Sequence, residues 1–203
     1  MPMDPSTSLF ALWLALTDAP ARSPEGSASP PRPIDGAVRA ELGGQFLQAL
    51  PAATATFGGA LALRTRSARV ELRGRWAMPQ RTFDQGHPDA GVRVDLWTLG
   101  ASGCYAPRWR RLEFPICAGL EFGVMRGRGF GVTRPRQAKM LYAAVPVDAN
   151  LVWAPIPRVG LLVGAGAGPT LVRPGFRLER AGQLFRAGPV ALRVVLGVEL
   201  RFP

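Results

Sequence analysis

The sequence contains one lysine, Lys139, and one histidine, His87, although 25 basic residues stand against 14 acidic ones. Arginine therefore carries almost all of the formal net charge of +11. A strongly basic protein could bind nucleic acid, but such proteins gather their cations in one block or stripe. Here the arginines are spread along the chain and interleaved with acids. We therefore expect no nucleic-acid partner.

Long hydrophobic runs are also missing. No stretch of about 18 apolar residues occurs, so the sequence predicts no transmembrane helix. The chain has no C-x-x-C pair, so the sequence indicates no zinc site or redox motif, and we expect no metal and no cofactor.

Cysteine is scarce, and the two that occur, Cys104 and Cys117, flank a turn at 107–111 almost symmetrically. This spacing favours a disulfide across a hairpin, formed in an oxidising compartment. The alternative is a pair of buried free thiols. Regular counting places Cys104 on the opposite face from Cys117, whereas cross-strand partners must share a face. A disulfide therefore predicts a β-bulge within 100–103, which would shift the alternation by one residue.

Residues 1–33 differ in character from the rest of the chain. An apolar run at 9–16 has the length of a signal-peptide core, and Ala19-Pro20-Ala21 follows it as a small-x-small pattern. No basic residue precedes the run, which leaves a short interfacial helix as the alternative. Residues 22–33 are rich in Ser and Pro and predict an unstructured leader. We therefore divide the chain into 1–33, signal-like and leader, and 34–203, one β-domain.

The β-domain is predicted from strict two-residue alternation, which is clearest in the last segment. From Val190 to Phe202 every even-numbered position is apolar, whereas the odd-numbered positions include Arg193, Glu199 and Arg201. Seven further segments alternate in the same way. The eight predicted strands span about 37–48, 54–64, 68–78, 91–105, 112–125, 139–153, 158–172 and 190–202.

The connections between these segments also have an order. They are short after the second, fourth and sixth strands, and long at 79–90, 126–136 and 173–188. Membrane barrels have short turns at one end and longer loops at the other, and each segment is long enough to cross hydrocarbon. The predicted fold is all-β, an eight-stranded antiparallel up-and-down transmembrane β-barrel.

The charged face is expected to line the interior. Charges enclosed in a small barrel must be paired, and arginine can hold a carboxylate through two hydrogen bonds. The predicted ionic interior consists of Arg39, Glu41, Arg69, Glu71, Arg73, Arg75, Arg93, Asp95, Glu113, Glu121, Asp148, Arg193, Glu199 and Arg201. The alternative is a soluble or periplasmic barrel that is apolar inside and binds an apolar ligand.

With these patterns in place, residues 37–202 resemble the small eight-stranded outer-membrane β-barrel proteins of Gram-negative envelopes. The terminal V-L-G-V-E-L-R-F looks like the last strand by which the barrel-assembly machinery recognises such proteins, although Pro203 follows the phenylalanine. Its lipid-facing residues would be Leu196, Val198, Leu200 and Phe202. The segment from Cys104 to Cys117, with Leu120-Glu121-Phe122-Gly123, is similar to uncharacterised barrels of this kind. The resemblance implies an outer-membrane location, lipid contacts and a monomer.

The sequence indicates no catalytic site. His87 lies in a predicted loop beside Asp84 and Asp89, where no strand spacing fixes a nucleophile, so a lipid-modifying enzyme is kept only as an alternative. The run Gly127-x-Gly129-x-Gly131 lacks the helix that a phosphate-binding loop requires. Arginines of the long loops could contact lipopolysaccharide phosphates. They are Arg126, Arg128, Arg134, Arg136, Arg173, Arg177, Arg180 and Arg186. We expect a structural or surface-interaction role for the protein.

Overall fold

The computed structural model describes residues 34–46, 50–83, 89–131, 137–178 and 182–202. The described residues all belong to one compact unit, 33–203. The predicted signal-like segment and leader, at 1–33, lie outside the described residues. Within those that are described, no helix has the length and apolar character needed to cross a membrane.

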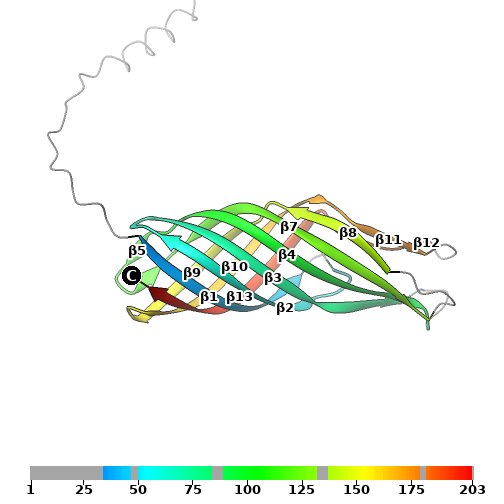
Figure 1. Ribbon diagram of the computed structural model, residues 1–203, viewed down its shortest axis with the longest axis horizontal. Helices are drawn as coiled ribbons and strands as arrows, with labels where there is room; N and C mark the ends of the chain where they lie inside the picture. The colour runs from blue at the N-terminus through cyan, green and yellow to red at the C-terminus, as the bar shows by residue number, and fades with distance from the viewer. Residues whose placement is uncertain (1–33, 47–49, 84–88, 132–136, 179–181, 203) are drawn as a thin grey trace, which may run out of the picture. The chain divides into compact units, whose positions relative to one another are not determined.

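The described residues form strands and connecting turns, and most strands belong to one sheet. In chain order the strands are β1 (Asp35–Phe46), β2 (Thr54–Arg64), β3 (Ala68–Phe83), β4 (Gly91–Tyr105), β5 (Arg108–Trp109), β6 (Leu112–Glu113), β7 (Ile116–Phe130), β8 (Gln137–Ala144), β9 (Val147–Ile156), β10 (Val159–Val172), β11 (Gly175–Leu178), β12 (Gly182–Arg186) and β13 (Val190–Phe202). The long strands run antiparallel to their neighbours and are seen side by side in Figure 1.

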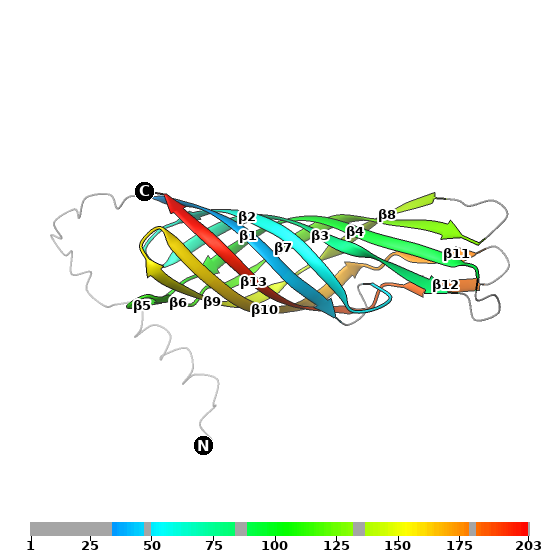
Figure 2. The same ribbon diagram turned by 90° about the horizontal axis from the view of Figure 1, so that it is seen from below.

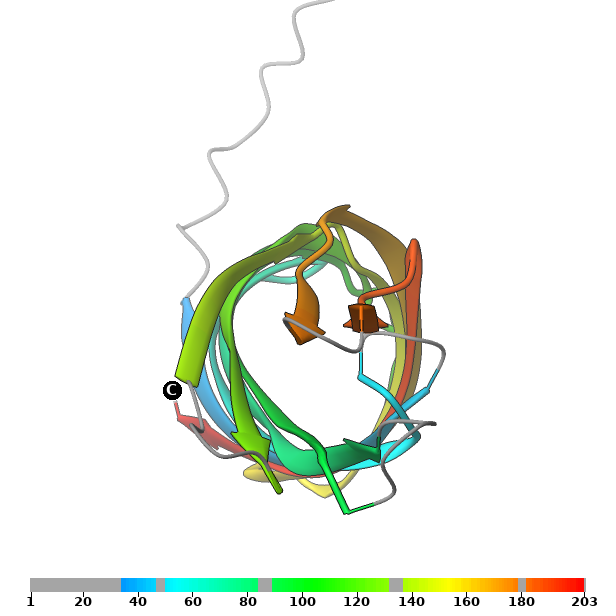
Figure 3. The same ribbon diagram turned by 90° about the vertical axis from the view of Figure 1, so that its right-hand side faces the viewer.

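The sheet closes on itself because its last strand pairs with its first. β13 pairs with β1 from Gly36–Phe202 to Phe46–Leu192, and with β10 on its other side. The view along the barrel shows the resulting ring (Figure 3). Its eight members are β1, β2, β3, β4, β7, the β8–β9 pair, β10 and β13, which is the predicted eight-stranded antiparallel barrel.

Prolines divide two of the predicted strands. The predicted strand 139–153 is β8 followed by β9, separated at Val145-Pro146, and the predicted strand 112–125 is β6 followed by β7, separated at Phe114-Pro115. Proline has no backbone N–H to give to a strand ladder, so it is found where pairing is interrupted. The alternation continues across both breaks, because Val147 and Ile116 again face outward.

The two ends of the barrel differ, as the connection lengths predicted. We call the end that holds Asp35 and Phe202 the turn end, and the opposite end the loop end. A small hairpin, β5–β6, lies at the turn end, where β6 pairs with β9. At the loop end a second hairpin, β11–β12, occupies the predicted loop 173–188 and is seen within the ring in Figure 3. The predicted loop 126–136 is also partly strand, because β7 continues to Phe130.

Through most of its height the wall is apolar on the outside. On β13, Leu196, Val198, Leu200 and Phe202 are all exposed, Leu196 to 59%. The other long strands repeat this pattern with outward leucine, valine, isoleucine and phenylalanine side chains, while arginines and carboxylates are buried. The soluble-barrel alternative required the opposite arrangement and does not describe this wall.

The predicted β-bulge at 100–103 is wrong. β4 pairs with β7 without interruption from Gly91 to Tyr105, and Cys104 lies directly opposite Cys117. The prediction failed because it took Val92 as an outward residue, whereas Val92 is buried and every even position of β4 faces inward. A register shift does occur, but on β3, between Ala77 and Gln80.

Candidate functional site: ionic interior and basic outer wall

The barrel interior near the turn end is filled by a continuous network of ion pairs. Glu71 of β3 lies at its centre and contacts three arginines: Arg39 at 2.7 Å, Arg73 at 2.7 Å and Arg69. Arg69, which is 1% exposed, also contacts Glu199 of β13. These pairs join β1, β3 and β13 across the interior.

The network continues in both directions from this centre. Toward the loop end, Arg73 contacts Asp148 at 2.8 Å, and Arg193 bridges Asp148 and Glu121 at 2.6 and 2.7 Å. Arg75 then contacts Glu121 and Glu41, both at 3.5 Å. Toward the turn end, Glu113 is contacted by Arg64 at 2.8 Å and by Arg201 at 3.1 Å.

Every carboxylate of this network contacts at least two guanidinium groups. An isolated buried charge costs several kcal/mol, and the cost is offset only where partners are close and hydrogen bonds are satisfied. Arginine suits such a site because its planar fork reaches two carboxylates at once: the Nη atoms of Arg39 donate two hydrogen bonds to Glu71, and its Nε lies 2.6 Å from Glu41. The interior therefore acts as a packed ionic core.

Glycine on the neighbouring strand provides the space for these side chains. A Cβ on Gly166 of β10 would overlap Oδ1 of Asp148, and a Cβ on Gly164 would overlap Oδ1 of Asn150. These two glycines of β10 are thus matched in register to the polar side chains of β9 that lie over them.

Twelve of the predicted interior residues lie in this network, and one buried member was missed. Arg64, at the end of β2, is buried and paired with Glu113, yet it was not among the predicted residues. The signal was present, because Arg64 has the same parity as the inward positions Ala60 and Ala62.

The two remaining predicted residues, Arg93 and Asp95, are not in the interior. Arg93 is exposed and Asp95 half-buried on the outer face, while Val92, Val94 and Leu96 are buried inside. The prediction assumed one polarity for the whole strand. The polarity in fact reverses along β4, since apolar side chains point outward from Trp97 to Tyr105 and inward from Leu96 to Val92.

The interior near the loop end is accordingly apolar. Phe176 of the β11–β12 hairpin packs there with residues of β4, β7 and β8. The buried residues of this cluster are Leu50, Ala77, Val92, Val94, Leu96, Met125, Tyr142, Ala144, Phe176 and Ala187. We call it the apolar plug.

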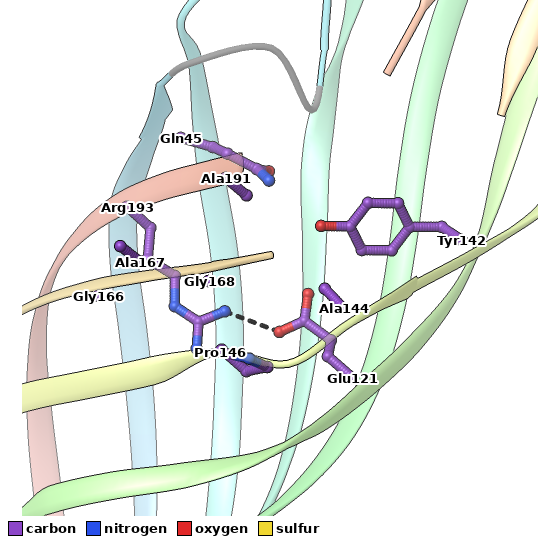
Figure 4. Close-up of a pocket in the computed structure, with 10 residues that line it drawn as sticks. All are labelled: Gln45, Glu121, Tyr142, Ala144, Pro146, Gly166, Ala167, Gly168, Ala191 and Arg193. Carbon is purple, nitrogen blue, oxygen red and sulfur yellow. Dashed lines mark hydrogen bonds and ion pairs between the residues drawn. The ribbon is translucent and has the colours of Figure 1, made fainter. Parts of the chain in front are cut away.

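A small cavity separates the ionic core from the apolar plug. It has a volume of about 10 Å³, and Figure 4 shows Tyr142, Glu121 and Arg193 around it, with the ion pair of Glu121 and Arg193 at its edge. This is about the space that one water molecule requires. The cavity offers no room for a substrate.

The outer face near the loop end carries a group of cations that we call the basic wall. It consists of Arg81 of β3, Arg93 of β4, Arg126 and Arg128 of β7, and Lys139 of β8, all exposed. Arg93 lies in register with Arg81 on one side and Arg128 on the other, and Arg126 with Lys139. Two members, Arg126 and Arg128, were expected to lie in a loop, but both are strand residues.

The other predicted loop arginines are divided. Arg173 and Arg186 are exposed at the loop end, and Nε of Arg173 donates a hydrogen bond to the carbonyl oxygen of Ala187 at 2.9 Å. Arg177 belongs to β11, while Arg134, Arg136 and Arg180 lie outside the described residues, as does His87.

Cys104 and Cys117 form a disulfide inside the barrel, with an S–S distance of 2.09 Å and Cα atoms 4.0 Å apart. Both are buried, and the two sulfurs lie within 4.8 Å of a carboxylate oxygen of Glu71. Because the sulfurs are bonded to each other, this grouping provides no thiolate for a metal ion.

The outward apolar face has the dimensions of a membrane-spanning band. On β4 it extends from Trp97 to Tyr105. At about 3.4 Å per residue and a tilt of about 40°, this is about 21 Å along the barrel axis, close to the ~25 Å apolar band of outer-membrane barrels.

Aromatic side chains lie at both borders of this band. Trp76 and Trp97, with ring centroids 5.8 Å apart, lie at its loop-end border, and Tyr105, Trp109 and Phe202 are exposed near the turn end. Closed sheet, apolar exterior and ionic interior together define a transmembrane β-barrel.

Comparison with solved structures gives the same class. The chain is similar to a major outer membrane protein from Thermus thermophilus (TM-score 0.58, 12% identity, 82% of this chain and 99% of that chain). It is also similar to Neisserial surface protein A (TM-score 0.53, 11% identity, 82% and 96%). A third similar structure is Ail, the attachment invasion locus protein of Yersinia pestis, in complex with the heparin analogue sucrose octasulfate (TM-score 0.53, 10% identity, 83% and 99%). The fold is that of the small eight-stranded outer-membrane β-barrel proteins.

At the level of sequence, no family model and no curated protein matches the chain.

Proposed function

We propose that this protein resides in the outer membrane of a Gram-negative envelope and has a structural or surface-interaction role without catalysis. The observation that carries the proposal is the reversal of polarity along the wall strands. On β7 the outward side chains change from Phe122 and Val124 to Arg126 and Arg128 within a few residues. If the whole wall were in water, nothing would favour large apolar side chains on the outer face on the turn-end side of Val124 and charged ones on the loop-end side.

The interior supports a non-catalytic role. Its carboxylates are each held by two or more arginines, and the cavity beside them is about 10 Å³. A general acid or base must reach a substrate, and a conducting channel must hold a column of water. The ionic core offers neither, so the exposed loop end is the part that would meet other molecules.

The outer face of the barrel supports two proposed binding partners. Outer-membrane lipids would contact the apolar band, and the barrel-assembly machinery would bind β13, whose outward side chains end in Phe202. Replacement Phe202→Ala should slow assembly in cells, whereas Val190→Ala, at the other end of the same strand, should not. Equal assembly rates for the two variants would contradict the role assigned to Phe202. We propose that the folded protein is a monomer.

Fractionation of cells expressing the full chain tests the location. The protein should appear in the outer-membrane fraction, require detergent for extraction, and migrate differently in gels before and after heating. Recovery of folded protein in aqueous buffer without detergent would overturn the proposal. A membrane-impermeant maleimide probe applied to intact cells should label Gln137→Cys, at the loop end, and should not label Arg66→Cys, at the turn end.

A further inference from the structure

We infer that the basic wall binds the phosphate groups of outer-leaflet lipopolysaccharide, an inference that rests on the membrane location proposed above. The wall comprises Arg81, Arg93, Arg126, Arg128 and Lys139, and it lies on the paired strands β3, β4, β7 and β8. The proposed binding surface is therefore a rigid sheet face.

The first argument is the placement of like charges in register. Arg81 lies opposite Arg93 on β3 and β4, and Arg93 lies opposite Arg128 on β4 and β7. Like charges directly opposite each other destabilise a sheet. Among the outward positions of these described rows the one acid is Asp95, which lies opposite Arg126. An anion bound between the arginines would remove the repulsion.

The second argument is depth. Arg126 follows Val124 by two residues on β7, and Asp95 precedes Trp97 by two residues on β4. Two residues of strand correspond to about 7 Å, so the cations begin directly where the apolar band ends. The head groups of the outer leaflet lie at this level, whereas a soluble protein partner would have to approach through them.

The third argument is geometry. Neighbouring strands are about 4.8 Å apart, so the row Arg81–Arg93–Arg128 is about 10 Å wide. Guanidinium groups at this spacing can each donate two hydrogen bonds to phosphate oxygens. The guanidinium of Arg81 is positioned by Phe130, whose ring centroid lies 5.8 Å from its central carbon, and Phe130 packs edge-on against Phe83 at 5.6 Å.

The test compares two charge-matched double variants of the full chain, refolded in detergent. Arg93→Gln/Arg128→Gln changes the wall, and Arg66→Gln/Arg158→Gln removes two exposed arginines at the turn end. Binding of purified lipopolysaccharide is measured with its phosphates intact and after chemical dephosphorylation. We expect the wall variant to bind intact lipopolysaccharide about 30-fold more weakly, because each cation near an anionic lipid surface changes the affinity about fivefold. The turn-end variant should bind as the unchanged protein does.

Three outcomes would overturn the inference: equal losses in the two variants, undiminished binding of dephosphorylated lipopolysaccharide, or full competition by millimolar inorganic phosphate, which would indicate a site for free phosphate. Arg93→Lys/Arg128→Lys should retain most of the affinity. Heat-dependent gel migration shows whether each variant has folded. If the barrel folds and requires detergent but does not bind lipopolysaccharide, this inference alone is overturned. If the protein is soluble in water, the proposed location is overturned as well.

Discussion

The guanidinium of Arg193 holds both carboxylate oxygens of Asp148, with Nε–Oδ1 and Nη2–Oδ2 distances of 2.8 and 2.6 Å. The two residues lie on β13 and β9, and β10 separates these strands in the sheet. The same carboxylate accepts a hydrogen bond from Arg73 of β3 at 2.8 Å, so that it is shared by one buried and one half-buried cation from two strands that are not neighbours in the sheet. The strands are thus connected through the centre of the barrel as well as around its wall.

Replacement Asp148→Asn should destabilise the folded barrel by about 3–5 kcal/mol, because it leaves Arg73 and Arg193 buried with less negative charge than they require. The free energy of unfolding in urea, measured in detergent micelles, checks this. Asp95→Asn is the matched control, since Asp95 is half-buried on the outer face, and it should change stability by no more than about 0.5 kcal/mol. Similar losses for the two variants would mean that the ionic core adds nothing specific.

A charge placed in the apolar band should be costly, and the same charge above it should not. Leu99→Arg puts a cation inside the band on β4, about 5 Å from its loop-end border, and should cost about 1–3 kcal/mol, between the values for the bilayer midplane and for the interface. Gln137→Arg lies beside the basic wall on β8 and should be close to neutral in stability. Folding in lipid vesicles measures both. A neutral Leu99→Arg would place the membrane elsewhere on the barrel.

The disulfide should stabilise the barrel without being accessible in it. Replacing both Cys104 and Cys117 by serine should lower the free energy of unfolding by about 3 kcal/mol, the value expected for a loop of this length. In the unchanged protein both sulfurs are buried, so reductant should cleave the bond only once the barrel is unfolded. Alkylation of reduced thiols followed by mass spectrometry reads this directly. Rapid reduction of the folded protein would show that the interior opens.

Gly127 of β7 and Phe176 of β11 should be energetically coupled. A Cβ on Gly127 would overlap the Phe176 ring, which is buried in the apolar plug. Gly127→Ala should therefore displace the hairpin and raise protease cleavage at the loop end, while the ionic core and heat-dependent migration are retained. In a double-mutant cycle, Gly127→Ala should cost less when Phe176 is already alanine. Additive effects would mean that the ring has space to move aside.

The sequence allowed the architecture to be predicted because a membrane wall imposes one simple rule. Outward leucines and inward arginines alternated clearly enough in β1, β3 and β13 to indicate the strands, their closure and the facing of Arg69 and Leu196. The same rule failed on β4, because alternation shows which residues share a face and does not show which face is inside. Which face carries the charges depends on the depth in the membrane. Arg93 lies beyond the apolar band, where the outer face is charged, and it therefore points outward.

Local chemistry explains the other differences. The loop prediction at 126–136 relied on glycine and arginine, yet Gly127 is a strand residue that makes room for Phe176. Phe176, the residue that requires a glycine here, lies far along the sequence on β11, so no pattern near Gly127 predicts the contact. The individual ion pairs could not be predicted either. Arg73 contacts Glu71, Glu41 and Asp148, which lie on three different strands and come together only when the barrel closes.

β3, β4 and β7 run farther toward the loop end than β1 and β2 do (Figures 1 and 2). The rim is therefore higher on one side of the barrel than on the other. We call the side that carries β3, β4, β7 and β8 the front. All five cations of the basic wall lie on the front. Lipopolysaccharide held by the basic wall would then lie on this one side of the barrel, so a neighbouring molecule in the membrane would meet that bound lipid only when it approaches from the front.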